Sequence, residues 1–311
     1  MSVNNSASTK SRIQKTLKNL YRCRALYLMI LPPIITVFVF HYIPIYGVQI
    51  AFKDYQTSLG ITGSEWVGLK HFIRFVEYPY FWKILKNTLW INIVSLLNFP
   101  LAIIFSIMLH EMRNIKLKKV CQIITYAPHF VSVVVVCSMT IMFLNREGLI
   151  NKIIGFFGVE AIDFMGIPSA FAPIMSITGL WSNLGWGTII YLATLAGVSM
   201  ELIEAAKIDG ATRMQIIWNV HLPHLKPTIV TMLILRIGSL LGVGFEKVFL
   251  LQNSLNIEAS SVISTYSYEM GLLGAQFSYS SAIGLFNNIV NIILVVTANA
   301  ISKKVAETGL W

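Results

Sequence analysis

Long apolar runs separated by polar segments dominate the chain. Six of these runs approach or exceed the roughly 20 residues that a helix needs to cross a bilayer. They predict membrane spans at about 25–51, 87–110, 118–144, 170–197, 226–250 and 281–301. The pattern therefore predicts an all-α integral membrane protein with about six transmembrane helices. We expect one transmembrane domain over 25–302, preceded by a basic tail at 1–24 and followed by a short tail at 303–311.

Two of the predicted spans contain residues that disturb a helix. Proline removes a backbone donor, and a helix broken in lipid persists only where other groups satisfy the freed backbone. These residues predict either a packing kink or a helix that opens to line a cavity. They are Pro32, Pro33 and Pro44 in the first span, and Asn183, Gly185 and Gly187 in the fourth.

Composition and charge support a membrane location and predict an orientation. Of the 311 residues, 55% are hydrophobic and 12% are charged, against about 25% charged residues in soluble domains. The net charge of +10 comes mainly from clusters beside the spans, in the tail at 1–24 and the loop at 111–119, whereas 251–280 has neither Lys nor Arg. The positive-inside rule then places both termini in the cytoplasm and argues against a nucleic-acid partner. The basic residues of 52–86, on the predicted outer side, count for less because that segment is long.

The segment 198–227, between the fourth and fifth predicted spans, carries the clearest local signals. Ser199 can cap a short helix, which Gly210 can end in a left-handed conformation. Thr212 can cap a second helix, which Pro223 stops. The first of these helices has a narrow face of small and apolar residues, and on the predicted cytoplasmic side such a helix is suited to docking in the groove of a partner protein.

The same segment resembles the EAA loop of binding-protein-dependent ABC importer permeases. Three short motifs at the spacing of that family carry the resemblance: Glu204-Ala205-Ala206, Asp209-Gly210-Ala211 and Leu222-Pro223. Further stretches look like the carbohydrate group of these permeases, typified by LplB-type subunits: Val243 to Asn253, Gly284 to Asn287 and Glu307 to Trp311. Arg236 departs from that group, in which a small or apolar residue is expected.

The resemblance implies a type I ABC importer permease fold in the bacterial plasma membrane, with both termini inside. The chain would form half of the transmembrane path for a sugar or oligosaccharide, beside a second homologous permease subunit. Two ATPase subunits and an extracellular solute-binding protein would complete the importer. The residues of the three motifs are then the expected coupling contacts to the ATPase subunits: Glu204, Ala205, Ala206, Asp209, Gly210, Leu222 and Pro223.

The sequence offers little support for chemistry on this chain. It has no G-x-x-x-x-G-K-[ST] phosphate loop, so we expect ATP-Mg on the partner ATPase subunits and no cofactor here. It has no catalytic motif and no carboxylate pair in a span, so we expect no enzyme. The cysteines, Cys23, Cys121 and Cys137, lack the spacing of a disulfide framework or a metal site. The scattered histidines are expected at surfaces or interfaces, and no metal site is expected.

A sugar path needs groups that pair with hydroxyls and flat aromatic faces inside the apolar domain. Buried amides also act as glue between membrane helices, and this alternative stays open for each Asn. Ionisable residues in spans are more often functional, although an ion pair between Arg236 and Glu246 would explain both. The path candidates are Trp181, Asn183, Trp186, Arg236, Glu246, Lys247, Asn287 and Asn291.

Two other classes of function compete with the importer permease. A secondary transporter subunit for a small polar solute would fit six spans, but no inverted repeat is visible and a docking loop would have no purpose there. An intramembrane enzyme would need catalytic pairs that the spans lack. The importer permease is therefore the leading interpretation.

Overall fold

The computed structural model describes residues 22–306, 309 and 310. Most of the predicted tail at 1–24 and part of the tail at 303–311 lie outside the described residues. The chain divides into two compact units, Met1–Gly68 and Leu69–Trp311. The domain boundaries expected from the sequence stay predictions.

The described part of the first unit is one long helical run followed by a small hairpin. The run comprises α2 (Arg24–Val37), the π segment η1 (Phe38–Tyr42), α3 (Ile43–Ile45) and the 3-10 segment η2 (Tyr46–Phe52). In the hairpin, β1 (Lys53–Asp54) pairs antiparallel with β2 (Glu65–Trp66), and α4 (Gly60–Gly63) lies between them. None of the side chains of α2 is buried, as suits an apolar helix surrounded by lipid or partner helices.

The helix does not open at the prolines of this first span, because the helical run continues from Arg24 to Phe52, and the alternative of a packing kink there stays a prediction. The π segment ends at Tyr42, two residues before Pro44, and the N–H of Ile43 bonds to the carbonyl of Phe38 across this wider turn. A π turn in this place accommodates a residue that cannot donate the usual helical hydrogen bond.

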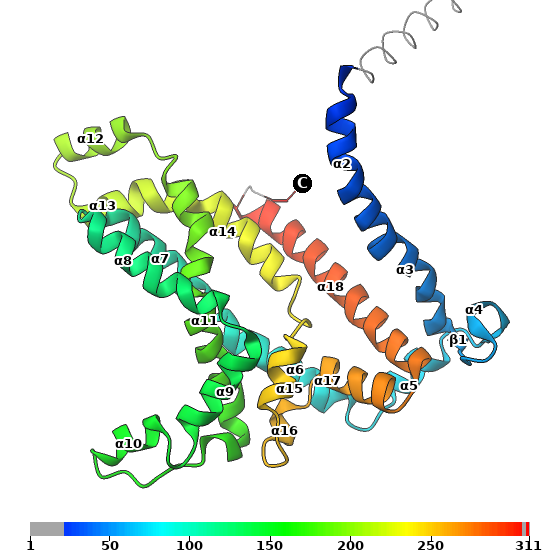
Figure 1. Cartoon of the computed structure of the whole chain (residues 1–311). Coiled ribbons are helices and arrows are strands. Elements are labelled where there is room, and N and C mark those ends of the chain that lie inside the picture. Colours follow the sequence, from blue (N-terminus) through cyan, green and yellow to red (C-terminus); the bar gives the residue numbers. More distant parts are fainter. Residues whose placement is uncertain (1–21, 307–308, 311) are drawn as a thin grey trace, which may run out of the picture. The chain divides into compact units, whose positions relative to one another are not determined.

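The second unit is built around a long central helix, α11, which packs against α6, α7, α8 and α14 (Figure 1). Before α11 lie α5 (Lys70–Val76), α6 (Phe81–Leu96), α7 (Phe99–Glu111), α8 (Ile115–Tyr126), η3 (Ala127–Phe130), α9 (Val133–Leu144), α10 (Leu149–Gly155), η4 (Phe164–Gly166) and η5 (Pro168–Ala170). The helix α11 itself spans Phe171–Leu195. After it lie α12 (Met200–Ile208), α13 (Arg213–Ile216), η6 (Ile217–His221), α14 (Leu222–Ile237), α15 (Phe245–Leu251), α16 (Ile257–Ser260), α17 (Ile263–Tyr268), η7 (Glu269–Leu273) and α18 (Phe277–Ala306).

The described residues contain 4 helices that are long and apolar enough to cross a membrane. A fifth is counted if the pair Pro168–Leu195 and Met200–Ile208, bent by 78°, forms one span. The helices are Arg24–Phe52, Phe81–Glu111, Val133–Gly155 and Phe277–Lys304. The fold is that of an all-α membrane protein, and the count of about six spans stays a prediction.

Two of the predicted spans are not continuous helices in the structure. The span at 118–144 is interrupted at Val131 and Ser132, between η3 and α9. The span at 226–250 is interrupted over 238–244, between α14 and α15. Because lipid offers no hydrogen-bond partners, these interruptions need partners from neighbouring helices.

The interruption after α14 has such partners. The peptide between Leu240 and Leu241 is held on both sides: Asn92 Nδ2 on α6 donates to the Leu240 carbonyl at 2.7 Å, and the Leu241 N–H donates to Asn291 Oδ1 on α18 at 3.2 Å. Leu241 itself is buried. Two amides from flanking helices therefore satisfy one peptide unit of the interruption.

The fourth span does not open at Asn183, Gly185 and Gly187 either, because α11 runs unbroken through all three, and the alternative of a packing kink stays a prediction. Gly185 has a packing role instead: a Cβ there would clash with the backbone carbonyl of Thr125 on α8. Glycine thus lets two helices approach closely, as small residues do in membrane bundles.

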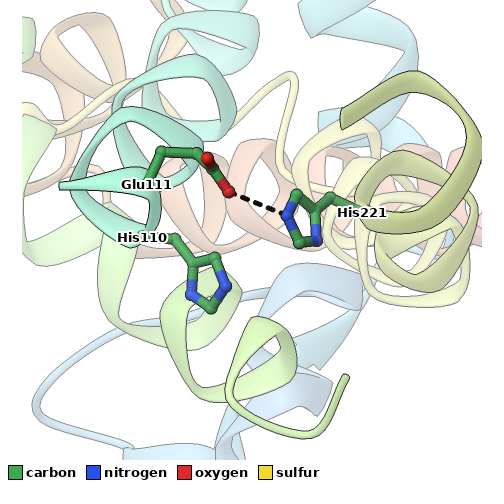
Figure 2. A group of neighbouring side chains, drawn as sticks. All are labelled: His110, Glu111 and His221. Atoms are coloured by element: carbon green, nitrogen blue, oxygen red, sulfur yellow. Dashed lines mark hydrogen bonds and ion pairs between the residues drawn. The ribbon is translucent and has the colours of Figure 1, made fainter. Parts of the chain in front are cut away.

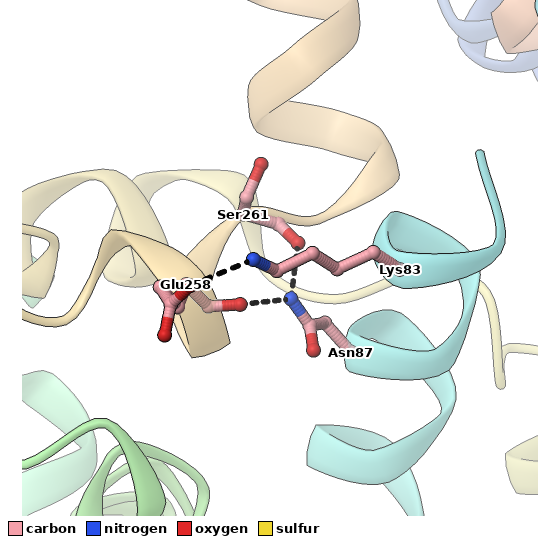
Figure 3. Close-up of polar contacts among 4 residues, drawn as sticks. All are labelled: Lys83, Asn87, Glu258 and Ser261. Atoms are coloured by element: carbon pink, nitrogen blue, oxygen red, sulfur yellow. Dashed lines mark hydrogen bonds and ion pairs between the residues drawn. The ribbon is translucent and has the colours of Figure 1, made fainter. Parts of the chain in front are cut away.

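The segments predicted on the outer side are folded and joined to each other. Lys83 Nζ on α6 lies 3.2 Å from Glu258 Oε1 on α16, and Asn87 Nδ2 donates to the carbonyls of Glu258 and Ser261 (Figure 3). The ion pair is exposed and contributes little stability by itself. It does explain why Lys83, a basic residue, lies on the predicted outer side against the positive-inside rule, since its partner belongs to the acidic segment 251–280.

Candidate functional site

The loop between α11 and α14 forms two short helices, as the sequence predicts. Gly210 has φ +79° and follows α12, and the N–H of Ala211 bonds to the carbonyl of Ala206 at 2.9 Å. This confirms the left-handed turn at Gly210. Thr212 caps α13 through a capping box with Gln215, also as expected. Ser199 stands at the start of α12, but its side chain makes no capping hydrogen bond.

The expected stop at Pro223 is wrong. The chain passes from α13 through the π segment η6 directly into α14, with Pro223 in its first turn. A proline is tolerated in the first turn of a helix because its missing N–H would have no partner there. The N–H of Leu222 bonds to the carbonyl of Ile217, five residues back, so the π turn again precedes a proline.

One face of α12 is anchored and the other is free. Ile203 is buried against Ile216 and Val220. Outward, Ile208 has 87% of its surface exposed, and Glu204 is exposed as well. Figure 1 shows α12 and α10 at opposite ends of the second unit, with α11 between them. An exposed apolar helix with a carboxylate, held on a short hydrophobic base, has the form of a docking element.

The seven motif residues differ in their surroundings. Glu204, Ala205, Asp209 and Gly210 are exposed and available to a partner. Ala206 and Leu222 are half-buried and pack on the chain itself. Pro223 is exposed. Only part of the family motif is thus free to touch another subunit, and the rest shapes the loop.

Three of the path candidates line one cavity of about 760 Å³ between α6, α7, α11 and α14. These are Asn183, Trp186 and Arg236. Asn183 Oδ1 lies 3.1 Å from His129 Nδ1, and the His129 ring stacks on Trp186 with centroids 4.3 Å apart. This first cavity therefore combines an amide and an aromatic face, both already engaged with His129, with the exposed guanidinium of Arg236.

A second cavity, of about 450 Å³, lies among α15, α17 and α18. Asn287 lines it, together with Ser264, Phe245 and Tyr268. Asn287 Oδ1 and Ser264 Oγ are both buried, and neither has a hydrogen-bond partner among the described residues. The rings of Phe245 and Tyr268 lie 4.9 Å apart. Unpaired polar atoms beside aromatic faces are the features that a sugar site requires.

The remaining path candidates have other surroundings. Asn291 holds the backbone of Leu241, and Lys247 Nζ donates to the carbonyl of Met175 at 2.9 Å, which ties α15 to α11. Glu246 is exposed, and in the described part of the chain no ion pair joins it to Arg236. Trp181 lines neither of the two cavities.

Sequence reasoning missed three residues of the second cavity: Phe245, Ser264 and Tyr268. It treated 251–280 as an external loop because that segment is short of long apolar runs. The run of hydroxyl side chains from Ser264 to Tyr268 was the available signal. In the structure this run forms α17 and packs into the core, with Tyr266 6.3 Å from the ring of Phe75.

Long apolar helices, an exposed docking loop and polar cavities between the helices are features expected of a transport permease. Residues 98–307 match the family of binding-protein-dependent transport system inner membrane components. The chain belongs to this family, and it is a multi-pass membrane permease subunit of an ABC importer. The alternative of a secondary transporter is thereby set aside.

Individual relatives support the assignment over nearly the whole chain. The chain is 45% identical over 304 residues to the polygalacturonan/rhamnogalacturonan transport system permease protein YteP of Bacillus subtilis (strain 168), covering 97% of this chain and 95% of that protein. It is 43% identical over 294 residues to protein LplB of the same organism, covering 94% and 92%.

A solved structure supports the fold independently. It is a bacterial ABC transporter involved in the import of the acidic polysaccharide alginate, one chain of which has a TM-score of 0.84 and 36% identity, covering 94% of this chain and 99% of that chain. A related structure, with the same scores, contains a periplasmic protein bound to an alginate pentasaccharide.

Proposed function

We propose that this subunit forms half of the transmembrane path for an acidic oligosaccharide. Relatives named for polygalacturonan/rhamnogalacturonan transport and for alginate import point to uronic-acid chains as the substrate class. The exposed guanidinium of Arg236 in the first cavity offers a charge complementary to carboxylates. Among the residues that the structure describes, no acidic side chain lines either cavity.

The observation that carries the proposal is the second cavity. Asn287 and Ser264 line it, and Asn287 Oδ1 and Ser264 Oγ have no hydrogen-bond partner in the described residues, so hydroxyls of a sugar bound there would pair with these atoms once the two side chains turn toward it. The neighbouring rings of Phe245 and Tyr268 offer faces for a sugar ring. A few such contacts bind weakly enough that the sugar can leave again, as translocation requires.

We further infer which subunit of the importer performs each step. ATP-Mg is bound and hydrolysed by two separate ATPase subunits, and α12 docks on one of them through Glu204, Ala205 and the exposed Ile208. A second homologous permease completes the path. An extracellular solute-binding protein delivers the oligosaccharide, which the solved alginate transporter in complex with its sugar-bound periplasmic protein supports. The chain itself carries no catalytic activity.

The test is uptake into proteoliposomes that contain the complete importer and its binding protein. Galacturonate oligosaccharides are compared with neutral oligosaccharides of equal length. Asn287→Leu is expected to lower uptake at least tenfold while the ATPase subunits remain bound. Asn288→Leu is the matched control, since Asn288 is its exposed neighbour on α18. Undiminished uptake by Asn287→Leu, or equal uptake of neutral chains, would contradict the proposal.

A further inference from the structure

Three potential metal ligands meet beside the coupling loop. His110 and Glu111 are the last two residues of α7, and His221 is the last residue of the π segment η6. Glu111 Oε1 lies 2.9 Å from His221 Nε2, and the two histidine rings are 5.0 Å apart (Figure 2). One ligand atom from each residue lies within 4.8 Å of the others. None of these residues takes part in the proposed sugar path.

His221 is buried in the protein interior, so its contact with Glu111 is not an ion pair at the surface. Its side chain is fully buried, with 0% of the residue exposed. The contact with Glu111 uses only one ring nitrogen, and Nδ1 has no hydrogen-bond partner within the described residues. Buried polar atoms are rarely left unpaired, so the pair with Glu111 does not fully account for the burial of this ring. π turns are also frequent at functional sites.

The donor set has the composition of a known class of metal site. Two imidazoles and one carboxylate bind Zn²⁺ and leave a fourth position for water. The carboxylate partly balances the charge of a divalent ion. Lys118 acts electrostatically on His110 and opposes a cation, so the site is expected to be of moderate affinity.

We propose that His110, Glu111 and His221 bind one divalent transition-metal ion of the zinc class, which clamps the end of α7 to the segment that follows the coupling helix. The clamp acts on the docking element through short links. Val220, adjacent to His221, packs against Ile203, the buried anchor of α12. An ion at His221 therefore stiffens the base from which α12 presents Glu204 to the ATPase. This differs from the sequence-based expectation of no metal site.

The experiment measures metal binding by the full chain, purified with its partner subunits and without a polyhistidine tag. Zn²⁺ affinity is determined by competition with a chromophoric chelator, and Co²⁺ reports ligand geometry through its visible absorption. We expect one Zn²⁺ for each chain and a Co²⁺ spectrum typical of four ligands. His110→Gln and Glu111→Gln should each weaken Zn²⁺ binding by about tenfold or more. Glu111→Gln is informative because it keeps an acceptor for His221 while removing the charge.

His224→Gln is the matched control. His224 lies in the same segment, but its ring bonds to the carbonyl of Thr194, outside the cluster. A second readout is hydrogen exchange over Ile217–His221, which Zn²⁺ should slow in the wild type and in His224→Gln only. The proposal is overturned if the wild type binds no stoichiometric Zn²⁺ at micromolar free metal. It is also overturned if His110→Gln and Glu111→Gln bind as tightly as His224→Gln.

Discussion

The two amides that hold the interruption after α14 allow a quantitative prediction. Asn92 on α6 and Asn291 on α18 bond to opposite sides of the same peptide, the one between Leu240 and Leu241. We predict that Asn92→Leu and Asn291→Leu each destabilise the folded chain. Leucine has the same branching and the same number of heavy side-chain atoms as asparagine, so the substitution removes the hydrogen bond without opening a cavity.

The expected magnitude follows from the burial of the peptide. Leaving a buried backbone group unpaired costs about 1–3 kcal/mol, whereas measured interhelical hydrogen bonds in membrane proteins average about 0.6 kcal/mol. Leu241 is only 2% exposed, which limits rescue by water, so we expect about 1–2 kcal/mol for each single variant. Once one amide is lost the peptide can move, so the second loss should cost less. The destabilisation of the double variant is then expected to be about 0.5–1 kcal/mol smaller than the sum of the two single-variant values.

The measurement is a double-mutant cycle on the purified chain in detergent, with unfolding followed by tryptophan fluorescence. Asn288→Leu serves as the control on α18, since its side chain is exposed and the change should stay within about 0.5 kcal/mol. Additivity within about 0.3 kcal/mol would show that the two amides do not share one structural unit. An Asn291→Leu variant as stable as Asn288→Leu would refute the reasoning altogether.

Three further predictions concern glycines and the docking helix. Gly210→Val should lower the free energy of unfolding by about 1–2 kcal/mol and impair coupling, because φ is +79° at this position. Gly210→Asn should be less destabilising, and equal unfolding curves for the two variants would contradict this prediction. Glu204→Lys should uncouple ATP hydrolysis from uptake by like-charge repulsion, with Glu204→Gln intermediate, and normal coupled transport in Glu204→Lys would count against it. Gly185→Ala should destabilise the chain by about 1–3 kcal/mol, because the added methyl group pushes against Thr125. Gly187→Ala is the control, since a methyl group there meets only ordinary contacts. If Gly187→Ala is the less stable variant, α11 and α8 do not approach each other closely at Gly185.

The sequence predicts the coupling loop well because its signals are local. A positive φ at Gly210 and a capping box at Thr212 depend on a few neighbouring residues. The apolar runs likewise predict where long helices lie, since hydropathy alone decides which segments can enter a bilayer. The first and last predicted spans match the helical runs Arg24–Phe52 and Phe277–Lys304 closely.

The positions of the interruptions could not be predicted in the same way. Pro32 and Pro33 lie within a continuous helix, and Pro44 follows a π turn, while the interruption over 238–244 contains no proline. What permits that interruption is a pair of amides located far away in the chain, Asn92 and Asn291. Gly185 was misread for a related reason, because its neighbour, Thr125, lies on another helix. Gly238, Gly242 and Gly244 are a local signal for the interruption, but the partners that satisfy its backbone depend on tertiary contacts.

The second cavity was missed on similar grounds, although one of its residues was predicted. Asn287 stood out as an amide in an apolar span, whereas Ser264 and Tyr268 belong to a segment with no membrane signal. Only the folding of α17 against α18 brings them together. The sequence likewise did not distinguish Asn287, whose side-chain oxygen has no hydrogen-bond partner among the described residues, from Asn291, which accepts a hydrogen bond from a backbone N–H.

The position of α14 connects the coupling loop to both cavities. This helix begins at Leu222, directly after the π segment of the loop, and ends at Ile237, directly before the interruption. Its 16 residues span about 24 Å at the usual helical rise. Arg236, near its end, lines the first cavity, and Phe245, just beyond the interruption, lines the second. A displacement of the loop by the ATPase would be carried along α14 and absorbed over 238–244, where turns held by a few backbone hydrogen bonds replace the continuous helix. The same residues that satisfy the interruption would then set how far that displacement reaches the cavities.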